Sequence, residues 1–161
     1  MILPLLIGAL LQITPVAPMP KGTALPPPTS EEGQVLAPIQ RIFDALTAGD
    51  AAAVLAATRP EGRATVAAER PDGTRSVRTL EWSAFAATLK PGGPRRVERF
   101  VGTPAVEVDG DIAMVWPPFD FTVDGKLSHC GVNHFSLVRE NAAWKVLNVT
   151  WSQRTTGCAA Q

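Results

Sequence analysis

Two Asp-Gly pairs in the second half of the chain constrain its fold more than any other feature. Asp109-Gly110 and Asp124-Gly125 each separate two apolar runs, and a polar turn at Asn141 separates a further pair of runs. Asp-Gly favours a type I′ turn, because both central residues of that turn need a positive φ. The region from Val106 to Trp151 is therefore predicted to form four antiparallel strands joined as a meander.

The first half of the chain has a helical pattern instead. Thr29 to Glu32 offer a capping residue and acidic first-turn residues, and apolar residues then recur at spacings of three and four up to Gly49. Pro38 inside this pattern predicts a start or a kink of the helix. Further helices are expected at 51–57 and 80–89, with short strands at 65–69 and 74–78. The fold class is therefore α+β, with helices packed on one face of an antiparallel sheet.

The N-terminal 24 residues predict a signal peptide and its cleavage region. Ile2 to Leu11 are nearly all apolar, but a run of about ten residues is too short to span a bilayer. Small residues offer cleavage after Ala17 or Ala24. We therefore expect an exported protein, periplasmic or secreted, with no membrane span in the mature form. The alternative is an apolar leader or a mis-chosen start codon.

The rest of the chain is predicted to contain one domain. Prolines mark residues 25–30 as a tether, because proline favours extended backbone without hydrogen-bonded partners. The domain is expected at 31–154 and a C-terminal tail at 155–161. Lys plus Arg and Asp plus Glu are 15 each, so the net charge is zero. That balance argues against nucleic acid and against an anionic membrane surface as partners.

Four segments together resemble the nuclear transport factor 2-like superfamily, and within it the bacterial SnoaL-like and lumazine-binding-like groups. They are Ile39 to Asp50, Val123-Asp-Gly-Lys126, His129-Cys-Gly-Val132 and Trp144-Lys-Val146. The resemblance implies a cystatin-like cone, in which a strongly curved sheet wraps around N-terminal helices and encloses a cavity. Members of the superfamily include isomerases, dehydratases, epoxide hydrolases and binding modules, so the fold alone does not determine the function.

Hairpin register sorts the strand residues onto two faces. If Val123 pairs with Lys126, then Asp120 lies opposite His129; Arg139 is likewise expected opposite Trp144. One face then presents the predicted ligand-binding residues: Trp116, Asp120, His129, Asn133, Asn148 and Thr150. The other face is apolar, which suggests a homodimer interface formed by Val115, Val132, Val149 and Trp151.

Asp120 and His129 form the candidate catalytic pair. A carboxylate beside an imidazole fixes its tautomer and gives a base near neutral pH. The same pair also fits a structural cross-strand hydrogen bond or a role in orienting a ligand. His129 and His134 are five residues apart and point to opposite faces of a regular strand, so we expect no metal site. The chain lacks tyrosine, on which the ketosteroid isomerase and scytalone dehydratase types rely, and enzyme activity is not supported.

The only cysteines, Cys130 and Cys158, predict a disulfide in an exported protein. Cys130 is expected opposite Gln153, which leaves five residues for the tail to return to it. Two free thiols in a cytosolic protein are the alternative.

The favoured function is the binding of a small, partly apolar molecule without catalysis or cofactor. The alternatives are a small-molecule isomerase, dehydratase or hydrolase that uses Asp120 and His129, and a structural dimerisation module whose cavity is filled by its own side chains.

Overall fold

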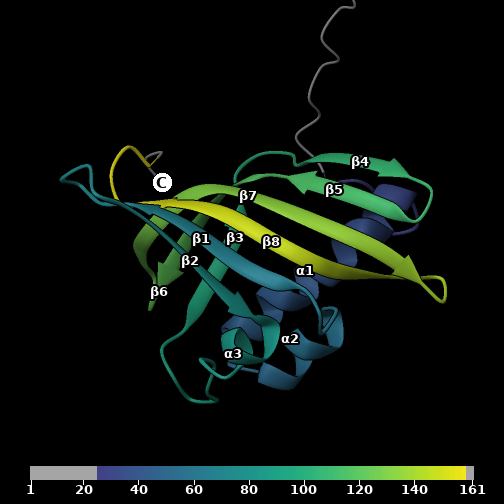
Figure 1. Cartoon of the computed structure of the whole chain (residues 1–161), viewed down its shortest axis with the longest axis horizontal. Helices are drawn as coiled ribbons and strands as arrows, with labels where there is room; N and C mark the ends of the chain where they lie inside the picture. The colour runs from purple at the N-terminus through teal and green to yellow at the C-terminus, as the bar shows by residue number, and fades with distance from the viewer. Residues whose placement is uncertain (1–24, 159–161) are drawn as a thin grey trace, which may run out of the picture.

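A computed structural model describes residues 25–158, in which three helices lie against an eight-stranded sheet (Figure 1). The helices are α1 (Glu31–Ala48), α2 (Ala51–Ala57) and α3 (Trp82–Ala86). The strands are β1 (Arg63–Glu69), β2 (Arg75–Glu81), β3 (Arg96–Phe100), β4 (Ala105–Asp109), β5 (Ile112–Trp116), β6 (Pro118–Val123), β7 (Lys126–Glu140) and β8 (Ala143–Arg154). The predicted signal peptide lies outside the described residues.

The helix α1 begins and ends where its sequence predicts. The Ser30 hydroxyl accepts a hydrogen bond from the Gly33 N–H at 3.1 Å, and Gly49 closes the helix at φ 68°. Of the two expectations for Pro38, a start of the helix is wrong, because α1 runs from Glu31 to Ala48 and Pro38 lies buried inside it. Burial of the apolar face around it offsets the one hydrogen bond that proline cannot donate.

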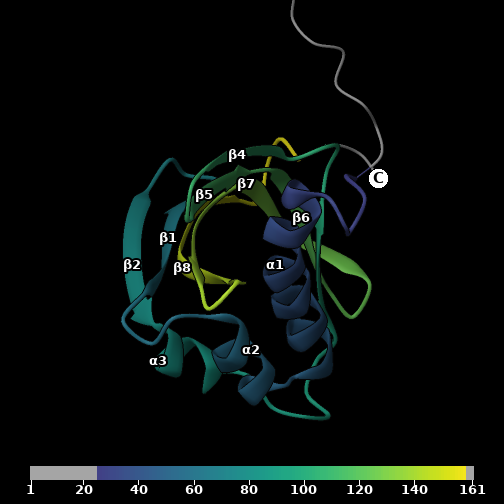
Figure 2. The same cartoon turned by 90° about the vertical axis from the view of Figure 1, so that its right-hand side faces the viewer.

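The sheet is mixed, whereas only antiparallel pairing was predicted. Its strands follow the order β2-β1-β8-β7-β5-β4, with β6 also paired to β7 and β3 paired to β6. All pairs are antiparallel except β1–β8, which is parallel. Hairpin signals report only strands that are neighbours in sequence, so this long-range pair has no local signature. Figure 2 shows the sheet curving around α1, with α2 and α3 at one end.

The hairpin turns match the Asp-Gly prediction in one case. Asp124 and Gly125 both have positive φ, as a type I′ turn requires. Asn141 and Ala142 form a similar turn between β7 and β8. In the first hairpin Asp109 pairs with Ile112, so the turn lies one residue later than its Asp-Gly pair, and Gly110 supplies the positive φ.

Two β-bulges change which side chains face the helices. In β7, Lys126 pairs with Val123 as predicted, but an extra residue at Ser128 places Cys130, not His129, opposite Asp120. In β8, Trp144 pairs with Arg139 as predicted, and the extra residue is Leu147. Each bulge shifts the register by one residue, which exchanges the two faces of the sheet for every residue beyond it.

The expected partner face is therefore largely wrong. Val115 is fully buried in the core, and Val149 and Trp151 line an internal cavity. Val132 alone lies on the outer side, since its neighbour Asn133 points inward. The outer side instead carries exposed Ile112, Met114 and Trp116, which alternate with buried Ala113 and Val115 along β5.

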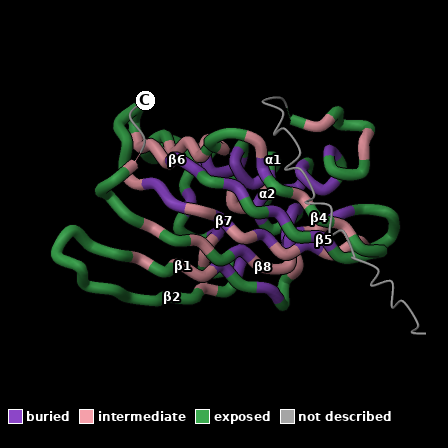
Figure 3. The backbone as a smooth tube through the Cα atoms, turned by 90° about the horizontal axis from the view of Figure 1, so that it is seen from above, coloured by how far each residue is buried: buried purple, intermediate pink, exposed green. Residues whose placement is uncertain are grey.

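The core lies between α1 and the inner side of the sheet. Figure 3 shows buried residues along α1 and along the central strands, while β2 is exposed. Its largest buried side chains include Trp82, Phe119, Ile39 and Leu137. None of the helices in residues 25–158 is long and apolar enough to cross a membrane.

A disulfide joins Cys130 to Cys158, which confirms the predicted pair. Cys130 lies opposite Arg154 and not opposite Gln153, because the bulge in β8 adds one residue to the register. The bond closes a loop with a sequence separation of 28 and holds Cys158 against β7.

We expect the double variant Cys130→Ser/Cys158→Ser to lose about 3 to 4 kcal/mol of unfolding free energy, since the loop no longer restricts the unfolded chain. Urea titration of the oxidised protein and the variant measures the loss. A reductant should lower the stability of the wild type and leave the variant unchanged. Equal stabilities of the two oxidised proteins would contradict the prediction.

Candidate functional site

An internal cavity of about 180 Å³ lies between the inner side of the sheet and the helices. Its walls come from α1, α3, the segment after α3, and strands β3, β6, β7 and β8. Seven aromatic side chains line it: Phe43, Trp82, Phe85, Phe119, Phe121, Phe135 and Trp151. An apolar cavity of about 150 Å³ accepts benzene, so this one accommodates a single ring with a short substituent.

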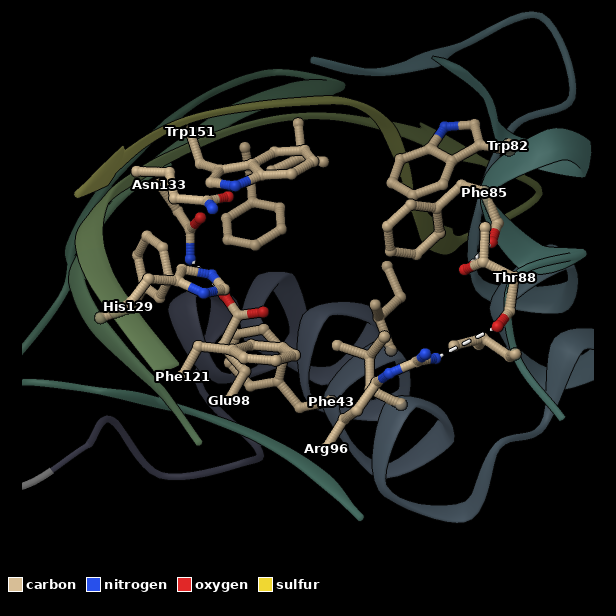
Figure 4. A pocket seen from close by; sticks show the side chains of 17 residues that line it. Phe43, Trp82, Phe85, Thr88, Arg96, Glu98, Phe121, His129, Asn133 and Trp151 are labelled. Atoms are coloured by element: carbon tan, nitrogen blue, oxygen red, sulfur yellow. Dashed lines mark hydrogen bonds between the residues drawn. The ribbon is translucent and has the colours of Figure 1, made fainter. Parts of the chain in front are cut away.

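Three polar side chains gather at one end of the cavity. Figure 4 shows Glu98, His129 and Asn133 pointing toward one another below Trp151. The Asn133 Nδ2 donates a hydrogen bond to Glu98 Oε1 at 2.6 Å, and Asn133 is only 2% exposed. A mostly apolar pocket with a few convergent polar groups is the usual form of a small-molecule site.

Glu98 supplies the carboxyl group among the residues that line the cavity. It reaches the cavity from β3, opposite Phe121 of β6. Burial raises the pKa of Glu98 to about 7, and the hydrogen bond from Asn133 opposes this rise only in part. Near neutral pH the carboxyl group is therefore divided between its neutral and ionised forms, so it can donate or accept a hydrogen bond.

His129 lies in an aromatic environment next to this carboxyl group. Its ring stacks on Phe121, with centroids 4.6 Å apart and an interplanar angle of 16°, and it meets Phe119 edge-on at 5.8 Å. Burial lowers the pKa of His129, so the imidazole is neutral at physiological pH. The hydroxyl oxygen of Ser128, the bulge residue, lies 3.2 Å from Nδ1 of His129, within hydrogen-bond distance.

The opposite end of the cavity has a different character. Trp82 and Phe85 pack edge-to-face at 5.7 Å, and Arg96 donates from Nη1 to the Thr88 carbonyl at 3.2 Å. In Figure 4 this arginine lies across the cavity from His129. This hydrogen bond holds the Arg96 guanidinium group at the Thr88 end of the cavity, away from Glu98, His129 and Asn133.

Two of the six predicted ligand-binding residues, His129 and Asn133, line the cavity, and the other four do not. Trp116 is half exposed on the outer side, 5.5 Å from the His134 ring. Asn148 accepts a hydrogen bond from the Arg63 N–H, and Thr150 is exposed. The two register shifts account for the positions of these four residues outside the cavity.

The predicted catalytic pair is not assembled either. Asp120 is buried, but it lies on the other side of β6, 3.6 Å from Arg99. His129 faces the cavity, so the two side chains point to opposite faces of the sheet. The bulge at Ser128 is the physical reason, because a regular ladder would have placed them opposite each other.

Glu98 was missed by the sequence analysis. Its strand, β3, carries charged residues on both faces, so it lacks the alternation that marks a strand. The only local signal is that Arg96, Glu98 and Phe100 share one face. Within residues 25–158, no group of His, Cys, Asp and Glu side chains is arranged to hold a metal ion.

Solved structures similar to this chain have the nuclear transport factor 2-like, or cystatin-like, fold. A superfamily protein from Salmonella enterica has a TM-score of 0.57 and 18% identity, covering 80% of this chain and 94% of its own. A protein from Cytophaga hutchinsonii has a TM-score of 0.61 and 11% identity, covering 78% and 99%. A cystatin-like protein of unknown function from Nostoc punctiforme has a TM-score of 0.56 and 10% identity, covering 78% and 92%.

No protein-family model and no curated protein matches the sequence. The protein therefore has the nuclear transport factor 2-like fold, as its sequence resemblance implied, and the α+β cone is confirmed.

We expect Glu98→Gln to remove a pH dependence of stability. Folding raises the pKa of Glu98, so this group's stabilising contribution is complete below its ordinary pKa and is lost as the pH rises through about 7. Relative to the wild type, the variant should gain about 1 to 2 kcal/mol at pH of about 8 and little at about 5. Urea unfolding at both pH values measures this, and an equal difference at both would contradict the raised pKa.

Proposed function

We propose that this protein binds a small, mostly apolar molecule in its internal cavity and does not catalyse a reaction. The observation that carries the proposal is the cavity itself, which has aromatic walls and a cluster of polar groups at one end formed by Glu98, Asn133 and His129. The aromatic walls supply the favourable free energy of burying the ligand, and the polar end sets its orientation. Asp120 is left out of this site, since it faces away from the cavity.

We propose further that the protein acts outside the reducing cytosol, in the periplasm or the secreted fraction. The disulfide between Cys130 and Cys158 supports this, because such bonds persist in oxidising compartments. The apolar run near the N-terminus is the sequence feature in favour of export.

Gln153→Trp tests whether the cavity is the binding site. Gln153 lines the cavity and is half-buried, so a larger side chain there reduces the space for a ligand. Binding of indole, used as a small aromatic probe and followed by calorimetry, should weaken by about tenfold or more. Thr150→Trp, on the exposed outer side of the same strand, is the control and should bind indole like the wild type. Equal binding by both variants would contradict the proposal.

A homodimer remains a second proposal, now with different residues. Ile112, Met114 and Trp116 are 60%, 37% and 50% exposed along the outer side of β5. Three large apolar side chains in a row on one strand favour burial against a partner, and a second copy of the chain is the proposed partner. This interface would leave the cavity on the other side of the sheet free.

Trp116→Glu tests the dimer. Sedimentation velocity should show a dimer for the wild type and mainly a monomer for the variant, because a buried carboxylate without a partner is costly. Leu55→Glu, an equally exposed leucine on α2, should leave the dimer unchanged. A wild type that stays monomeric at high concentration would overturn the proposal.

A further inference from the structure

Glu98 holds a carboxyl group in the cavity wall without a compensating charge. Oε1 accepts the hydrogen bond from Asn133, a neutral amide. Among the described residues, Glu98 forms no ion pair, although Arg99 beside it on β3 pairs with Asp120 on the other side of the sheet. The negative charge of ionised Glu98 therefore has only neutral partners. An unpaired charge is unfavourable in an apolar setting.

Apart from Glu98 itself and Arg96, the residues that line the cavity are uncharged. They include Phe43 of α1, Phe121 of β6, and Asn133 and His129 of β7. Burial keeps His129 neutral, so it does not supply the missing positive charge.

Arg96 is the nearest cation on the same face of β3 as Glu98, but its guanidinium group is turned away. It donates to the Thr88 carbonyl at the other end of the cavity (Figure 4). The space beside Glu98 is thus lined by aromatic rings and by the Glu98 carboxyl group, which is negative when ionised.

Aromatic ring faces attract cations and repel anions, because their π-systems carry negative charge above and below the ring. Phe121 and Trp151 lie at the end of the pocket where Glu98 points (Figure 4), and one face of Phe121 is covered by the His129 ring. A carboxylate combined with such faces recognises a positively charged ligand group. A neutral ligand would leave the ionised form of Glu98 unpaired and favour only its protonated form.

We propose that the ligand of this cavity is a small aromatic amine, bound in its protonated form with the ammonium group against Glu98 and the ring among the aromatic side chains. This assignment rests on the proposed binding function and specifies its ligand class. The cavity volume of about 180 Å³ limits the ligand to one ring and a short amine-bearing chain.

Calorimetry with a matched pair of probes tests the assignment. 2-Phenylethylamine and 2-phenylethanol have the same shape and differ in charge. At pH of about 8 the wild type should bind the amine about tenfold more tightly than the alcohol. Glu98→Gln keeps the acceptor for Asn133 and should lose that preference while still binding the alcohol. Glu107→Gln, which removes an exposed carboxylate on β4, is the control and should keep it.

The pH dependence gives a second readout. The amine stays protonated between about pH 6 and 8, whereas Glu98 ionises in this interval. Affinity for the amine should therefore rise several-fold over the interval, and affinity for the alcohol should not. In Glu98→Gln both affinities should be flat.

The outcomes separate the two proposals. Equal or tighter binding of the alcohol, or an amine preference that survives in Glu98→Gln, overturns the amine assignment and leaves the binding function standing. If neither probe binds, and indole does not bind either, the binding function and the amine assignment both fail.

Discussion

The hydrogen bond from Trp82 Nε1 to the Leu147 carbonyl, 2.8 Å long, holds the geometry on which the cavity depends. Leu147 is the extra residue of the bulge in β8, and its carbonyl is free to accept this bond because it leaves the regular ladder. Gly62 lies against the same carbonyl, where a Cβ atom would come within 1.6 Å of the oxygen. One displaced peptide group thus connects α3, the start of β1 and β8.

The two bulges together give the cavity its aromatic character. Beyond the bulge in β8, Val149 and Trp151 face inward in place of Asn148 and Thr150. Beyond the bulge in β7, the inner side of β6 carries phenylalanine in place of Asp120. Regular ladders would have produced a much more polar interior. The polar groups around Glu98 stand out in this cavity, because the bulges turn Asp120, Asn148 and Thr150 away from it.

The sequence alone predicts the parts of this structure that have local causes. The cap at Ser30, the end of α1 at Gly49, the turn at Asp124-Gly125 and the disulfide all follow from particular residue types at particular positions. The bulges do not, because Ser128 and Leu147 are ordinary strand residues and the shift comes from tertiary contacts such as the Trp82 bond. Four of the six predicted ligand-binding residues therefore lie outside the cavity. Glu98 was not predicted, because its strand lacks the alternation of apolar and polar residues.

The strand β3 supplies polar residues to the cavity from outside the main path of the sheet. This strand pairs only with β6, apart from the main path of strands, yet it supplies both Glu98 and Arg96 to the cavity wall. The buried core includes residues of α1, β7 and β8, and from β3 only Phe100 packs against it. Substitutions at Arg96 and Glu98 can consequently change which molecules the protein recognises while the packing of that core stays the same.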